Sequence, residues 1–148
     1  MADPDAALVG AATRALLPIE AVRLAYLFGS RARGPARPDS DLDIAVVYAG
    51  DSDVAQREIL RRRVVAALTD ALGAVGERAD VVDLELAPSE IAFAAIRATR
   101  LFARTDAERI RHEVRIARRY DDDAPRRALF RAAAKRVAEE MGRADGRS

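Results

Sequence analysis

The sequence predicts an α/β protein of one domain, because short apolar strand patterns alternate with longer helical patterns along its 148 residues. No internal repeat and no linker-like stretch divides the chain, and a domain of this length buries a sizeable core. We expect residues 1–148 to form a single unit. Its core should cover about residues 20–105, followed by C-terminal helices over about 106–141 and a frayed tail at 143–148.

The chain opens with a helix and a strand. Residues 5–17 are rich in Ala and Leu, and Pro18 ends the helix that this composition predicts. Residues 22–28 are apolar and stop at Gly29, which predicts a buried strand. The residues after Gly29 can form one short helical turn before a loop rich in Gly and Pro.

A second strand and a long helix come next. Residues 42–48 are apolar and β-branched and are stopped by Gly50, so they predict another buried strand. Within residues 53–72 the apolar side chains recur at helical spacing, and Gly73 provides a stop signal.

The C-terminal half continues the alternation. Residues 80–86 predict a third strand, and residues 88–97, which begin Pro-Ser-Glu, predict a short helix. Residues 101–103 are a candidate for a short fourth strand. Two helices, over residues 106–120 and 125–141, are separated by a run of three aspartates.

The bulk composition excludes several classes of protein. Twenty-five basic against 24 acidic side chains leave a net charge of +1, which argues against a chain that mainly coats nucleic acid. The absence of cysteine excludes disulfides and thiolate metal sites. No apolar run reaches the roughly 18 residues that a membrane span needs, and the first residues lack the basic start of a signal peptide. We expect a cytoplasmic protein with neither membrane nor nucleic acid as a partner.

The first functional signal is the pair Gly29-Ser30, directly after the predicted strand. Glycine lets the backbone turn tightly and lets a ligand approach the main-chain N–H groups. Ser30 adds a hydroxyl where a helical turn begins, and such a terminus attracts anions. These residues predict a site for phosphate groups.

The second signal is the pair Asp41 and Asp43, at the start of the second predicted strand. Residues two apart on a strand project from one face, roughly 6.5–7 Å apart along the chain. Two neighbouring carboxylates in an apolar strand repel each other, and a divalent cation relieves the repulsion. Oxygen ligands without His or Cys favour Mg²⁺. Taken alone, such a pair is more often structural; the nearby Gly29-Ser30 favours the metal site.

Together these residues resemble a known family. Gly29-Ser30, ten residues and then Asp41-x-Asp43 is similar to the signature of the polymerase-β-like nucleotidyltransferase superfamily. The fuller string, with Ala32, Arg33 and Gly34 after Ser30, resembles its minimal nucleotidyltransferase branch, which includes antitoxins paired with HEPN-domain ribonuclease toxins. The looser resemblance extends over about residues 20–125. It implies a small mixed β-sheet with helices mainly on one face.

The superfamily uses a third carboxylate on a later strand, and this chain offers two candidates. Arg78-Ala-Asp80 followed by two valines resembles the family pattern and favours Asp80. Asp83 lies three residues further along, so on a regular strand it faces the opposite side. We prefer Asp80 and keep Asp83 as the alternative.

The resemblance implies a chemistry for these residues. Asp41, Asp43 and Asp80 would bind one or two Mg²⁺ ions, and Asp80 would act as the general base. Gly29 and Ser30 would hold the β- and γ-phosphates of ATP. Either Arg31 or Arg33 would neutralise the leaving pyrophosphate, although a structural salt bridge is as good an interpretation of each arginine.

The resemblance also implies an acceptor. AMP would be transferred to a tyrosine hydroxyl of a HEPN ribonuclease toxin, which would be silenced, and the two proteins would form a hetero-oligomer. The sole histidine, His112, lacks the arginine spacing of a HEPN ribonuclease, so this chain is not the toxin. Two alternatives remain: an enzyme that modifies a small hydroxylated molecule such as an aminoglycoside, and an antitoxin that acts by binding alone.

Overall fold

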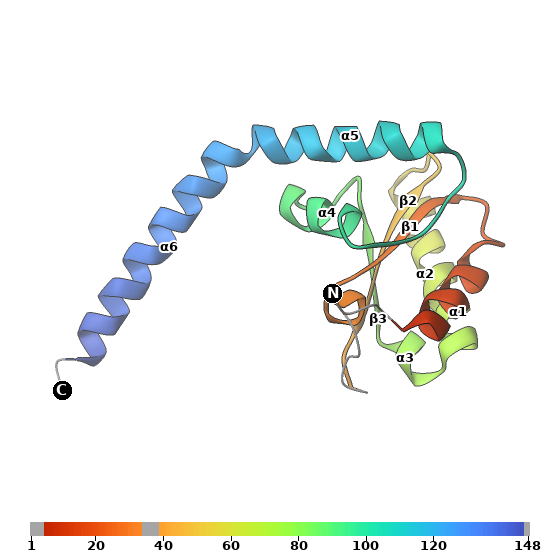
Figure 1. Ribbon diagram of the computed structural model, residues 1–148, viewed down its shortest axis with the longest axis horizontal. Coiled ribbons are helices and arrows are strands. Elements are labelled where there is room, and N and C mark those ends of the chain that lie inside the picture. Colours follow the sequence, from red (N-terminus) through yellow and green to blue (C-terminus); the bar gives the residue numbers. More distant parts are fainter. Residues whose placement is uncertain (1–4, 34–38, 147–148) are drawn as a thin grey trace.

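One four-stranded sheet, in the order β3-β2-β1-β4, forms the centre of the protein (Figure 1). The computed structural model describes residues 5–33 and 39–146. β1 is antiparallel to β2 and β4, whereas β2 is parallel to β3, so the sheet is mixed and the predicted fold class is confirmed. The elements in chain order are α1 (Ala6–Leu16), β1 (Val22–Phe28), the 3₁₀ turn η1 (Ser30–Arg33), β2 (Leu42–Tyr48), α2 (Val54–Leu72), α3 (Ala74–Glu77), β3 (Ala79–Asp83), α4 (Ser89–Ile96), β4 (Thr99–Ala103), α5 (Asp106–Asp122) and α6 (Ala124–Asp145).

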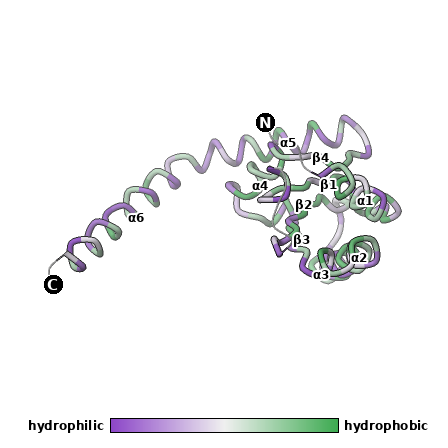
Figure 2. Tube along the Cα trace, turned by 60° about the horizontal axis from the view of Figure 1, so that its bottom comes forward, coloured by the Kyte–Doolittle hydropathy of each residue, from purple (hydrophilic) through white to green (hydrophobic). Residues whose placement is uncertain are grey.

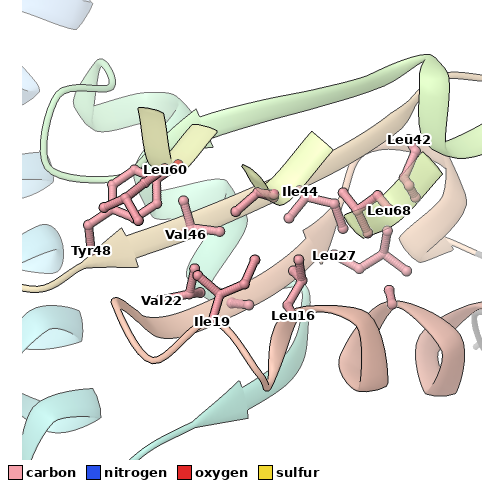
Figure 3. Close-up of a cluster of buried hydrophobic side chains, with 13 residues drawn as sticks. Leu16, Ile19, Val22, Leu27, Leu42, Ile44, Val46, Tyr48, Leu60 and Leu68 are labelled. Atoms are coloured by element: carbon pink, nitrogen blue, oxygen red, sulfur yellow. The ribbon is translucent and has the colours of Figure 1, made fainter. Parts of the chain in front are cut away.

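Helices cover both faces of this sheet, which corrects the expectation that they lie mainly on one. On one face α1 and α2 pack against side chains of β1 and β2, and Figure 3 shows part of this cluster around Ile44, Val46 and Leu68. On the other face α4 and α5 supply Ala92, Ala95 and Ile116 to a second cluster. The central strands β1 and β2 are apolar on both faces, and each face therefore needs a cover.

Side-chain caps and a glycine set the helix ends. Asp5 accepts hydrogen bonds from the backbone N–H groups at the start of α1, which satisfies donors that the helix leaves unpaired. α2 begins with a capping box between Asp53 and Gln56 and ends at Gly73. The short helix α3, directly after Gly73, was not predicted.

Two strands differ in length from the prediction. β3 ends at Asp83 rather than 86, because the backbone N–H groups of Leu86 and Ala87 turn back to the Asp83 carbonyl and the Asp83 carboxylate accepts from Glu85 N. β4 begins at Thr99, two residues before its predicted start. The expected loop over residues 34–38 lies outside the described residues.

α5 packs against the core, whereas α6 extends away from it. α5 is tied to the core by the hydroxyl of Tyr26, which donates to Glu113 at 2.7 Å, and by Arg119, which donates to the Ala87 carbonyl. α6 projects away from the body of the protein (Figure 1), and none of its 22 described residues is buried. No helix in the described part of the chain is long and apolar enough to cross a membrane.

α6 extends four residues beyond its predicted end at 141. The helix continues through Asp145 and ends at Gly146. The single Gly142 within it does not interrupt the helix, because one glycine costs only about 1 kcal/mol relative to alanine. Residues 147–148 lie outside the described residues.

Candidate active site

Two predicted site residues, Asp43 and Asp80, are direct neighbours in the sheet. β2 and β3 pair in parallel with Asp43 opposite Asp80, and Asp43 also pairs with Phe28, the last residue of β1. Residues paired across adjacent strands project from the same face, and neighbouring strands lie about 4.8 Å apart. Both carboxylates therefore lie at one end of the sheet, on the face that α4 and α5 cover.

Gly29 forms the bend next to Asp43. Its φ of 72° lies in the left-handed region, which an L residue with a Cβ adopts only with strain. A Cβ added at this position would overlap a carboxylate oxygen of Asp43 and lie 3.0 Å from its carboxyl carbon. Both the conformation and the close approach therefore require glycine.

The electrostatics of the site are those of a crowded acidic pair. Partial burial raises the pKa of Asp43 above its ordinary value, and the charges of Asp80 and then Asp41 raise it further. Asp41 lies just before β2 and is exposed. The negative charges of Asp41 and Asp80 thus both act on the Asp43 carboxylate.

Asp83 lies on the opposite face of the sheet and has another role. Its carboxylate pairs with Arg57 of α2, which also binds Glu85 at 3.0 Å. The side chains of Arg57 and Asp83 are only 13% and 14% exposed, so this is a largely buried ion pair. Asp83 thus forms an ion pair that holds α2 against the edge strand of the sheet. Of the two candidates, only Asp80 lies on the same face as Asp43.

The arginines and the serine around Gly29 differ in their surroundings. Arg31 donates two hydrogen bonds, of 3.1 and 2.8 Å, to the carbonyl oxygen of Ser40, and so it fastens η1 to the residue before Asp41. Ser30 and Arg33 are exposed. Arg31 therefore has a positioning role in addition to any contact with a ligand.

The donor set fits Mg²⁺ bound together with a substrate. Across residues 5–33 and 39–146, no three acidic or histidine side chains lie close enough to hold a metal ion by themselves. Magnesium commonly uses one or two carboxylates and completes its shell with water and substrate phosphates. Asp43 and Asp80, with Asp41 close by, supply that number of oxygen ligands.

Two residues at this end of the sheet were not singled out from the sequence. Phe28 is the register partner of Asp43 and packs on the cluster beneath α4. Arg97 ends α4 two residues before Thr99, which pairs with Leu27, so Arg97 lies at the same end of the sheet as Asp43. No local spacing marks either residue; only the strand register reveals them.

The comparison with protein families matches the description "Polymerase beta, Nucleotidyltransferase" over residues 14–108, which is well over half of the chain. The chain belongs to this nucleotidyltransferase family. The matched range includes the whole of η1, β2 and β3, and therefore every candidate site residue. The protein is a nucleotidyltransferase, and a nucleotide is its substrate. A comparison with curated proteins finds no match.

Solved structures with similar folds come from toxin–antitoxin complexes. A crystal structure of a toxin–antitoxin with AMP-PNP is 26% identical, covers 85% of this chain and 98% of its own, and has a TM-score of 0.63. The MntA–HepT toxin–antitoxin is 25% identical, covers 86% and 97%, and has a TM-score of 0.58. A tri-AMPylated Shewanella oneidensis HEPN toxin in complex with MNT antitoxin is 22% identical, covers 85% and 98%, and shows the same fold with a TM-score of 0.58. The resemblance to the minimal nucleotidyltransferase branch is thus confirmed.

Proposed function

We propose that this chain is the antitoxin of a HEPN ribonuclease toxin and silences it by transferring AMP from ATP to a tyrosine hydroxyl, in the cytoplasm. The observation that carries the proposal is the pairing of Asp43 with Asp80 beside the Gly29 bend. Paired carboxylates next to a backbone turn suit a triphosphate and its cation. The toxin–antitoxin structure with AMP-PNP supports the choice of nucleotide and partner.

The site residues divide the work. Asp41, Asp43 and Asp80 hold Mg²⁺, which when bound neutralises triphosphate oxygens and lowers the pKa of the acceptor hydroxyl. Gly29 and Ser30 hold the β- and γ-phosphates. Asp80, exposed at the edge strand, takes the proton from the tyrosine hydroxyl as general base.

The reaction exchanges a phosphoanhydride bond of ATP for a phosphoester bond to tyrosine. The tyrosine oxygen forms a bond to the α-phosphorus, the bond from that phosphorus to the β-phosphate oxygen breaks, and pyrophosphate leaves. Arg31 or Arg33 neutralises the charge that develops on the leaving group. Of the two, Arg33 is exposed at the end of η1, whereas the guanidinium of Arg31 already binds Ser40.

The test is a transfer assay with ATP labelled at the α-phosphate, Mg²⁺ and the proposed HEPN toxin. We expect label on a toxin tyrosine with the wild-type chain and no label with Asp43→Asn. Asp70→Asn, which removes an exposed carboxylate of α2, is the matched control and should retain the activity.

Three results would contradict the proposal. Label on an aminoglycoside, but not on the toxin, would favour the small-molecule enzyme. Full neutralisation of the toxin by Asp43→Asn would favour an antitoxin that acts by binding alone. Transfer of GMP, CMP or UMP in preference to AMP would contradict the choice of ATP.

A further inference from the structure

We propose that α4 and α6 form a docking surface for an acidic, amphipathic helix of the protein acceptor; this inference rests on the proposed transfer to a protein. α6 is the least attached element of the fold and lies beyond the residues that match the family. Four of its large apolar side chains are exposed: Leu129 (74%), Phe130 (77%), Val137 (55%) and Met141 (66%); the last three share one face. A helix held away from the core with such side chains in water requires a partner to cover them.

These side chains form a stripe rather than a scatter. Phe130, Ala134, Val137 and Met141 follow one another at intervals of four, three and four residues, which places them on one face of a helix. Figure 2 shows hydrophobic positions recurring among hydrophilic ones along the whole of α6. The stripe is long enough to contact a partner helix over about three turns.

The stripe begins in a pocket at the base of α6. This pocket, of about 650 Å³, lies between α4 and the junction of α5 with α6. Phe130 and Arg131 line it together with Phe93 of α4 and Arg97, which caps that helix. Tyr120 forms its floor, since its ring stacks on Phe93 with centroids 4.1 Å apart. Such an aromatic and arginine-rich pocket is typical of the residues that dominate protein interfaces.

The direction of α6 is fixed at this pocket. The guanidinium of Arg127 lies 3.5 Å from the ring centroid of Tyr120 and also donates to the Tyr120 carbonyl. This contact holds the first turn of α6 against the end of α5, so the surface is formed before a partner arrives, which lowers the cost of binding.

Charge identifies the kind of partner. α6 carries six basic side chains against three acidic ones, while the whole chain is almost neutral. The arginines of the pocket outnumber its single carboxylate, Glu90. Two copies of α6 packed together would bring like charges into contact, which disfavours a second copy of this chain as the occupant. An acidic partner gains from the same charges.

The position of the surface connects it to catalysis. Arg97, in the pocket, lies at the same end of the sheet as Asp43, and Phe93 packs on the same cluster as Phe28, the register partner of Asp43. A protein seated in this pocket therefore contacts the end of α4 that lies at the same end of the sheet as Asp43. Docking there would present an acceptor tyrosine to the nucleotide.

The experiment measures the affinity of the chain for the proposed HEPN toxin by calorimetry, in wild type and four single variants. Phe130→Asp and Arg131→Glu should each weaken binding at least tenfold. Leu129→Asp and Arg136→Glu are matched controls, because each lies one residue before a stripe residue and about 100° around the helix. These controls should change affinity less than threefold, and binding of AMP-PNP should be the same in all four.

Several outcomes would overturn the proposal. Equal losses in controls and stripe variants would do so, as would unchanged binding in all four or no binding by the wild type. A wild-type chain that is a dimer by light scattering and becomes a monomer with Phe130→Asp would assign the stripe to a second copy. Asp43→Asn separates the two proposals: it should bind the toxin without modifying it. Modification by Asp43→Asn would refute the proposed function alone, whereas full neutralisation by Phe130→Asp would refute the docking surface alone.

Discussion

The carboxylate of Asp43 occupies the space where a side chain of residue 29 would begin. Gly29 and Asp43 are brought together because β1 and β2 pair with Phe28 opposite Asp43, so the bend after β1 passes directly over the carboxylate. One strand pairing thus places the Gly29 bend beside the acidic pair, so the two sequence signals lie together at one end of the sheet.

Gly29→Ala should therefore abolish nucleotidyl transfer, and Gly73→Ala should not. Both glycines have positive φ, of 72° and 61°, so each alanine costs about 1–2 kcal/mol of backbone strain. Only the alanine at 29 also displaces the Asp43 side chain, because nothing lies within 4 Å of a Cβ at 73. Thermal unfolding and the labelled-ATP assay on both variants check this. Equal activity in the two variants would show that the close approach to Asp43 is unimportant.

Asp43→Asn should stabilise the metal-free protein at neutral pH while it abolishes transfer. Folding raises the Asp43 pKa above its ordinary value of 3.8, so the folded state binds this proton more tightly than the unfolded chain. Ionised Asp43 therefore costs stability once the pH is above its folded pKa, and this cost disappears as the pH falls below its unfolded pKa. Asparagine carries no charge and therefore avoids this loss of stability.

The measurement is the melting temperature of wild type and Asp43→Asn in a chelator, from pH 7 down to pH 3. The variant should melt at the higher temperature at pH 7, and the gap should narrow as the pH falls. Asp70→Asn, on the exposed surface of α2, should show no such gap. A variant less stable than wild type at pH 7 would contradict the crowding of carboxylates at Asp43.

The sequence predicts most of this fold because its local signals are strong. The bounds of β1 and β2 match the apolar runs residue for residue, and Asp53 and Gly73 mark the ends of α2. The end of β3 was predicted three residues late, because apolar residues continue past Asp83 while the backbone turns back on that residue. The hydrophobic pattern alone does not predict where this turn begins.

The residues of the candidate site could be proposed from the sequence, but their contacts in space could not. Spacing identified Gly29 and Asp43, and alternation along a strand indicated that Asp80 and Asp83 face opposite sides. The partner of Asp83 is Arg57, 26 residues away on α2, and no local pattern links the two. The same applies to Arg97, which reaches the acidic end of the sheet only through the register of β4.

Asp80 and Asp83 should respond to substitution in opposite ways. Asp83→Ala removes the partner of a largely buried arginine and should cost about 1–3 kcal/mol of folding stability. Asp80→Ala removes an exposed carboxylate and should change stability by less than about 0.5 kcal/mol, yet lower transfer at least about 100-fold. Chemical denaturation and the transfer assay on both variants distinguish the roles. Loss of transfer without loss of stability in Asp83→Ala would exchange the two assignments.

Truncation separates the folded unit from the docking surface. A chain that ends at 123 loses α6, of which no residue among the 22 described is buried, so we expect a loss of about 1 kcal/mol, mainly from the contact of Arg127 with Tyr120. A chain that ends at 105 also loses Ile116 and the Glu113 partner of Tyr26, and it should not fold. Circular dichroism and thermal unfolding measure both. Unfolding of the longer truncation would show that α6 supports the core, and the single folded unit would then extend into α6.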